Sequence, residues 1–199
     1  MTLTAIVFSM GFYAANAQIE KGKVMLGGQI FVGNSDQKTE GPSKTIQNSK
    51  NAQFNFNAGY ALKENHVAGI SLTYGKSKSE YNTTSSDYQY MTDTKGHNHH
   101  FGGFYRVYKA LGNDFYFFGQ ADAGIASSKL TQTTNNVEKV IKTTSGGVGL
   151  TPGLSYQILK KVQMEVVIPS IISAQYSKGN SNSPGLPEET SKSFNFETN

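Results

Sequence analysis

Three histidines lie close together in the sequence GHNHH, at His97, His99 and His100. Imidazoles are common metal ligands, but a zinc site needs three or four ligands that converge at about 2 Å. The chain contains no cysteine, and the nearby carboxylates Asp87 and Asp93 fall in the same polar segment as the histidines. We therefore interpret the cluster as part of a solvated loop, and we expect no metal site and no cofactor.

Serine and threonine are abundant, so catalysis by a serine, a histidine and an acid is the second chemistry to consider. The three side chains would have to lie on one face at matching height. His66 lies at a short turn and His100 near the opposite end of a strand, and strand alternation gives neither of them an adjacent serine and acid. The G-x-G at Gly147–Gly149 lacks the following helix that a phosphate-binding loop requires. We expect no catalysis.

The composition restricts the class of protein. A hydrophobic content of 37% and a mean hydropathy of -0.43 are too low for a helical membrane protein. They suit a transmembrane β-barrel, in which only alternate residues of each strand face lipid. The absence of cysteine excludes disulfides and sulfur redox chemistry. The net charge is +4, but the lysines and arginines are scattered along the sequence, so we expect no nucleic-acid partner.

The clearest secondary-structure signal is a hairpin between Phe101 and Ile125. Both of its arms carry apolar residues at every second position, which is the period of a β-strand with one apolar face: Phe101, Gly103, Tyr105 and Val107, then Phe115, Phe117, Gly119, Ala121, Ala123 and Ile125. The turn between the arms, Lys109–Asp114, contains Gly112 and Asn113. Each apolar face has about the length that crosses a bilayer core.

Further strands show the same alternation and are joined by connections that alternate between long and short. The expected strands include Val24–Val32, Phe54–Leu62, Ala68–Tyr74, Val148–Ile158 and Val162–Tyr176. Short turns fall at Lys63–Asn65 and Leu159–Lys161, and long polar segments at Asn34–Lys50, Lys76–Asn98, Ser127–Ser145 and Ser177–Lys192. In outer-membrane barrels the periplasmic turns are short and the outside loops long. The pattern therefore predicts four long extracellular loops.

The two ends of the chain carry separate expectations. Met1–Ala17 is predicted to be a signal peptide that ends in the cleavage pattern Ala15–Ala17, which leaves 18–199 as the barrel domain. An eighth strand starts at Ser193, but the sequence ends at Asn199. An open strand edge in lipid leaves backbone groups unpaired. We therefore expect the last strand to be truncated in this sequence, or to pair only partially with the first strand.

Strand alternation directs three charged residues into the lumen: Arg106, Asp122 and Glu165. Counted from the short turns, Arg106 and Glu165 lie at comparable heights, and Asp122 lies further out. We predict a structural lumen ion pair between Arg106 and Glu165, because charges in a narrow lumen usually pair. An eight-stranded barrel is normally filled by side chains.

Three parts of the sequence carry a resemblance to a known family. They are the segments FYRVYKALGNDFYFFGQADAGI and GGVGLTPGLSYQILKKVQMEV, and the ANAQ at the end of the predicted signal peptide. The chain resembles the outer-membrane protein β-barrel domain family of Gram-negative bacteria. The resemblance implies a small exported eight-stranded barrel in the cell outer membrane, inserted by the barrel assembly machinery. It implies no defined activity.

These observations lead to one expectation and several alternatives. We expect an all-β, antiparallel, up-and-down transmembrane barrel that is monomeric and surrounded by outer-membrane lipid. Its role is expected to be structural or one of surface interaction, and extracellular loops that bind an outside ligand would carry it. The alternatives are a porin-like small-solute pore, a lipid-active enzyme, and a soluble lipocalin-like carrier with its apolar faces turned inward. Alternation alone does not distinguish outward from inward apolar faces.

Overall fold

The computed structural model describes residues 8–12, 19–41, 44–84, 89–159, 162–185 and 187–198, and in this part of the chain the regular structure is a single antiparallel sheet. The strands are β1 (Phe8–Phe12), β2 (Val24–Thr39), β3 (Lys44–Lys63), β4 (His66–Thr84), β5 (Gln89–Gly112), β6 (Phe115–Thr134), β7 (Val137–Leu159), β8 (Val162–Val167), β9 (Ile172–Asn182) and β10 (Glu189–Thr198). Within the described ranges, no helix is long and apolar enough to span a membrane.

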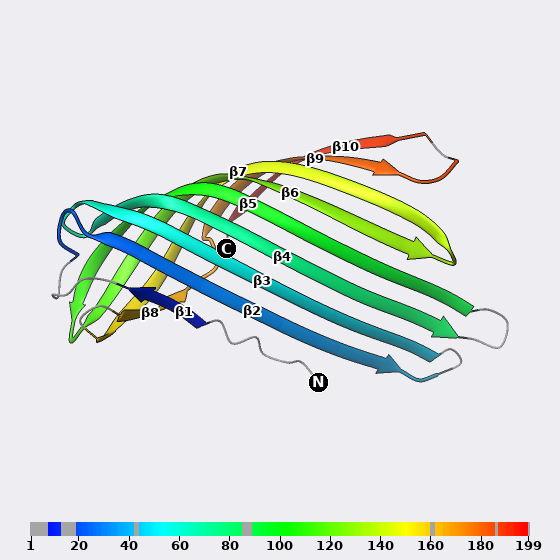
Figure 1. Ribbon diagram of the computed structural model, residues 1–199, viewed down its shortest axis with the longest axis horizontal. Helices are drawn as coiled ribbons and strands as arrows, with labels where there is room; N and C mark the ends of the chain where they lie inside the picture. Colours follow the sequence, from blue (N-terminus) through cyan, green and yellow to red (C-terminus); the bar gives the residue numbers. More distant parts are fainter. Residues whose placement is uncertain are drawn as a thin grey trace.

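Strands β2 to β7 pair in sequence order, as expected of an up-and-down topology (Figure 1). The predicted seventh strand, Val162–Tyr176, is present in two pieces: β8 pairs with the β7 segment that starts at Gly153, and β9 pairs with the segment that ends at Leu150. Pro169, which has no amide hydrogen to donate, lies in the break between them. The amides of Ile168 and Ile171 still bond β7 carbonyls. β8 and β9 therefore act as one interrupted strand.

The sheet closes at one end and stays open at the other. At the end where the short turns lie, β1 pairs with both β2 and β8, and β8 pairs with β7. The strands β1 to β8 therefore form a closed, hydrogen-bonded ring at this end. At the other end, β10 pairs with β9, and no pairing joins β10 to β2 among the described residues (Figure 1). The antiparallel up-and-down fold is thus confirmed, although the sheet as a whole is not closed.

Part of the predicted signal peptide contributes to this ring. The five residues of β1 lie within Met1–Ala17, whereas the rest of that segment, including Ala15–Ala17, lies outside the described residues. The first two predicted short turns are found where the sequence predicts them. Asn65 adopts a φ of 59°, and Asn113 and Asp114 adopt φ values of 50° and 64°. Residues 160–161 of the third short turn are outside the described ranges.

The prediction of four long extracellular loops is wrong. The polar segments continue the strands of the barrel wall and end in short connections; β6, for example, ends at Thr134 and β7 begins at Val137. Hydroxyl pairs join the neighbouring strands, with oxygen–oxygen distances of 3.1 Å for Thr45–Thr83 and 3.0 Å for Ser49–Ser79. We call these segments the strand extensions: 34–39 with 44–50, 76–84 with 89–98, 127–134 with 137–145, and 177–182 with 189–192.

The two faces of the barrel wall differ sharply. Phe117 is 40% exposed on the outer face, whereas its neighbour Phe118 is fully buried on the inner face. The buried apolar residues gather near the short-turn end: Ile19, Met25, Ala61, Val67, Phe104, Tyr108, Tyr116 and Phe118. Large apolar side chains such as Phe101 and Leu150 are exposed on the outside. The apolar face therefore points away from the lumen, opposite to the arrangement of a lipocalin-like carrier.

Candidate lumen site

Arg106 and Glu165 reach the lumen because of strand alternation. On β5, Phe104, Arg106 and Tyr108 are buried on the inner face, while the residues between them are exposed. Glu165 lies on β8 and is buried on the same side as Gln163. The ring closure at this end brings β8 round to face β5, so the two charged side chains meet across the lumen.

The pair is close and fully surrounded. Arg106 Nη1 donates to Glu165 Oε1 at 2.8 Å and to Oε2 at 2.9 Å, and the two side chains are only 5% and 8% exposed. The Tyr108 hydroxyl donates to Glu165 Oε1 at 3.1 Å and accepts from Arg106 at 2.8 Å. On its other edge, the guanidinium donates to Gln120 Oε1 from Nε at 2.9 Å and from Nη2 at 2.7 Å. Buried charges require such partners.

Aromatic side chains fill the remaining space at this level. The guanidinium carbon of Arg106 lies 4.4 Å from the ring centroid of Phe118, within the range of a cation–π interaction. The Phe118 ring packs against Gly153 of β7, where an added Cβ would overlap it. Tyr108 stacks beside Phe118 with ring centroids 5.6 Å apart. This group, which we call the lumen plug, consists of Phe104, Arg106, Tyr108, Phe118, Gln120 and Glu165.

A polar chamber of about 560 Å³ lies against the lumen plug. Its lining is rich in amides and hydroxyls, including Gln29, Asn55, Asn57, Ser71, Thr73, Thr151 and Ser170. Asp122 also lines the chamber, and it hydrogen-bonds Gln120. The structure thus brings Arg106 and Glu165 together and places Asp122 further along the same hydrogen-bonded chain, through Gln120.

One group of chamber residues was missed at the sequence level. His100, Asp122 and Ser170 line the same lumen cavity, so the inference that no histidine, serine and acid share a face is wrong. Ser170 lies in the break between β8 and β9, where the inward–outward alternation of a regular strand does not apply. Its Oγ is 2.9 Å from Thr151 Oγ1.

The remaining histidines are spread over the two faces of the wall. His97 and His99 lie on the outer face with ring centroids 5.8 Å apart, and His99 stacks on Tyr74. His100 faces the lumen, so the three histidines do not converge. In the part of the chain that the structure describes, no group of three His, Asp or Glu residues could hold a metal ion. His66 Nδ1 lies 2.7 Å from the Tyr105 hydroxyl near the short turns.

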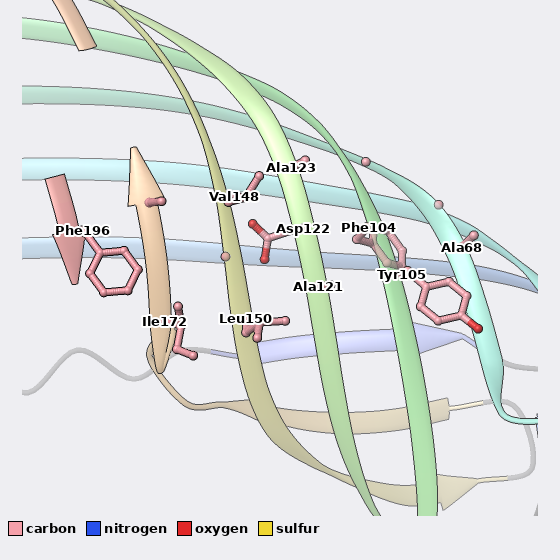
Figure 2. A pocket seen from close by; sticks show the side chains of 14 residues that line it. Ala68, Phe104, Tyr105, Ala121, Asp122, Ala123, Val148, Leu150, Ile172 and Phe196 are labelled. Atoms are coloured by element: carbon pink, nitrogen blue, oxygen red, sulfur yellow. The ribbon is translucent and has the colours of Figure 1, made fainter. Parts of the chain in front are cut away.

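A larger hollow of about 810 Å³ lies on the outer wall and has an almost wholly apolar lining (Figure 2). Small side chains such as Ala121 and Ala123 form its floor, between Tyr105 on one side and Phe196 on the other. This lining offers few polar groups to a ligand, and it continues the apolar surface of the wall. The polar chemistry of the molecule is therefore inside the lumen and on the strand extensions.

An antiparallel up-and-down wall with an apolar outside and a polar inside is the arrangement of a membrane-spanning β-barrel. The chain belongs to the family described as outer membrane protein beta-barrel domain, whose match covers residues 3–185. The protein is therefore located in the outer membrane.

No curated protein gives a significant match. Among solved structures, the beta domain of the Bordetella autotransporter BrkA is similar over 96% of this chain and 97% of its own, with 11% sequence identity and a TM-score of 0.35.

Proposed function

We propose that this protein is a non-catalytic outer-membrane barrel that holds a polar β-sheet, formed by the strand extensions, outside the cell for a structural or surface-interaction role. The observation that supports the proposal most is the continuity of the strands. β5 runs without interruption from Gln89 to Gly112, so its polar part is hydrogen-bonded to the same neighbours as its apolar part. The extensions are therefore held rigidly by the barrel wall.

The reach of the extensions supports an outside role. From Phe101, at the edge of the apolar face, β5 continues back to Gln89, which is roughly 40 Å along the strand at about 3.4 Å per residue. The short turns lie at the other end, which is the periplasmic end in barrels of this kind. The extensions consequently point away from the cell.

The lumen plug favours this role over that of a pore. Arg106 and Glu165 are almost completely buried, and Phe118 fills the lumen beside them. A solute would have to displace a paired and desolvated charge to pass. We therefore propose that the barrel conducts no solutes in its resting state.

Labelling of intact cells tests the direction of the extensions. Because the chain contains no cysteine, single cysteines can be introduced by Glu138→Cys in an extension and by Lys109→Cys near the short turns. Both positions are exposed. A membrane-impermeant maleimide should label the first variant on intact cells and the second only after permeabilisation. The reverse result would contradict the proposal.

Three measurements test the role itself. Planar-bilayer recordings should show no stable single-channel current; a steady current would favour the pore. Deletion of 129–142, which begins and ends at directly opposed residues of β6 and β7, should leave a heat-modifiable barrel but abolish binding to host or environmental surfaces that the full chain supports. An unchanged lipid profile on overexpression would agree with the absence of catalysis, whereas altered lipids would contradict it.

A further inference from the structure

Lysines that are scattered along the sequence gather on one face of the folded sheet. The register places Lys50 opposite Lys78, Lys78 opposite Lys95, Lys129 opposite Lys142, and Lys178 opposite Lys192. His97 lies between Lys76 and Lys129 in the same way. We call this set the lysine belt: Lys50, Lys76, Lys78, Lys95, Lys129, Lys142, Lys178 and Lys192.

The belt lies directly beyond the apolar outer surface. Its lysines are exposed, and alternation places them on the same face as the outward apolar residues. On β4, Lys76 follows Tyr74, and Nζ lies 5.6 Å from the ring centroid of Tyr74. On β9, Lys178 follows Tyr176 in the same alternation. The belt therefore lies at the level where the apolar surface of the wall gives way to the strand extensions.

Like charges directly opposite each other on neighbouring strands are destabilising. Two belt lysines form an ion pair with a carboxylate: Lys78 with Glu80, and Lys95 with Asp93. Among the described residues, the other six belt lysines form no ion pair. Within the described ranges, the opposed pairs Lys129–Lys142 and Lys178–Lys192 therefore carry positive charge that no carboxylate neutralises.

We propose that the lysine belt binds the anionic phosphate groups of lipids in the outer leaflet. Phosphate is the charge that a row of lysines recognises, and lipid headgroups lie at the edge of the apolar surface, where these lysines are. The belt extends along the outside of the wall from β3 to β10, which matches a lipid layer that surrounds the barrel. A compact partner would instead meet a local patch at the tips of the extensions.

Lipid retention tests this proposal. The full chain is inserted into vesicles that contain equal amounts of phosphatidylglycerol and phosphatidylcholine, extracted in mild detergent, and its retained lipids are counted by native mass spectrometry. The wild type should retain several-fold more phosphatidylglycerol than phosphatidylcholine. The belt variant K76Q/K129Q/K142Q should lose this enrichment, and high salt should weaken it in the wild type.

A matched variant controls for net charge. K21Q/K63Q/K109Q removes the same charge from exposed lysines near the short turns and should retain the wild-type enrichment. Heat-modifiable gel mobility checks that each variant is folded. Equal retention of the two lipids by the wild type, or undiminished enrichment in a folded belt variant, would overturn the proposal.

A second measurement separates lipid phosphate from free phosphate. The thermal stability of the wild-type barrel should rise when phosphatidylglycerol replaces phosphatidylcholine in the vesicles, and the belt variant should show a smaller rise. Inorganic phosphate added to phosphatidylcholine vesicles should not reproduce the effect. If it does so fully, the belt is a site for free anions and the lipid proposal fails. The assignment to the outer leaflet rests on the outward direction proposed for the strand extensions, whereas the lipid-retention and stability measurements in vesicles do not depend on that direction.

Discussion

Arg106 of β5 and Glu165 of β8 meet across the lumen, with 2.8 Å between Nη1 and Oε1 and almost no exposure of either side chain. The pair joins two strands that are far apart in the sequence and that face each other because the ring is closed at this end. Stability therefore depends on both partners together.

Removal of one member of this pair should be strongly destabilising. Glu165→Gln leaves a buried guanidinium without its counter-charge and should lower the free energy of unfolding by about 3–5 kcal/mol. Urea unfolding in vesicles, followed by gel mobility, measures the loss. The double variant R106M/E165L should recover most of it, since both charges are then absent. If the double variant is less stable than E165Q, the unpaired buried charge is not the main cause of the destabilisation, and the prediction is wrong.

Gly153 is required for the close packing of the lumen plug. Gly153→Ala places a Cβ where the Phe118 ring lies and should cost about 1–3 kcal/mol, as overpacking of a core does. The matched control is Gly119→Ala on β6, where an added Cβ meets nothing within 4 Å. Thermal unfolding of the two variants should differ clearly. Equal melting temperatures would mean that the ring moves aside freely.

A charged side chain on the outer face should destabilise the barrel more strongly the closer it lies to the middle of the membrane. Leu150 lies near the middle of the apolar face of β7, and a lysine there should lower the free energy of unfolding by about 2–4 kcal/mol. Ser127→Lys, on the outer face but beyond the apolar surface and opposite His99 and Thr144 rather than a lysine, should have little effect. Unfolding of both variants in phosphatidylcholine vesicles measures the difference. If both are neutral, the apolar face does not contact lipid.

The turn between β6 and β7 depends on a left-handed backbone. Asn135 and Asn136 have φ values of 46° and 68°. Asn136→Val should cost about 1–2 kcal/mol locally, because β-branched side chains are disfavoured there, whereas Asn136→Gly should be tolerated. Hydrogen exchange at the flanking amides of Thr134 and Val137 should accelerate in the valine variant alone. Similar exchange in both variants would contradict a strained turn.

Much of the wall was predictable because a strand with one apolar and one polar face has a visible period of two. Counting residues from the short turns is also enough to place Arg106 and Glu165 at one height, because both lie a similar number of residues from their turns. The strand extensions were missed because both of their faces are polar, so no apolar alternation marks them. Ser170 was missed because it lies in a strand break. The lysine belt emerges only when the strands are aligned, since its members lie far apart in the sequence.

The strand extensions have another consequence. Neither of their faces packs against a core, so nothing inside the barrel fixes how long they must be. Residues removed or added in directly opposed pairs, such as Thr131 with Val140, change the height of the outer rim but leave every side chain below on its original face. The rim is therefore the part of this molecule whose dimensions are free to vary while the membrane-spanning wall stays the same.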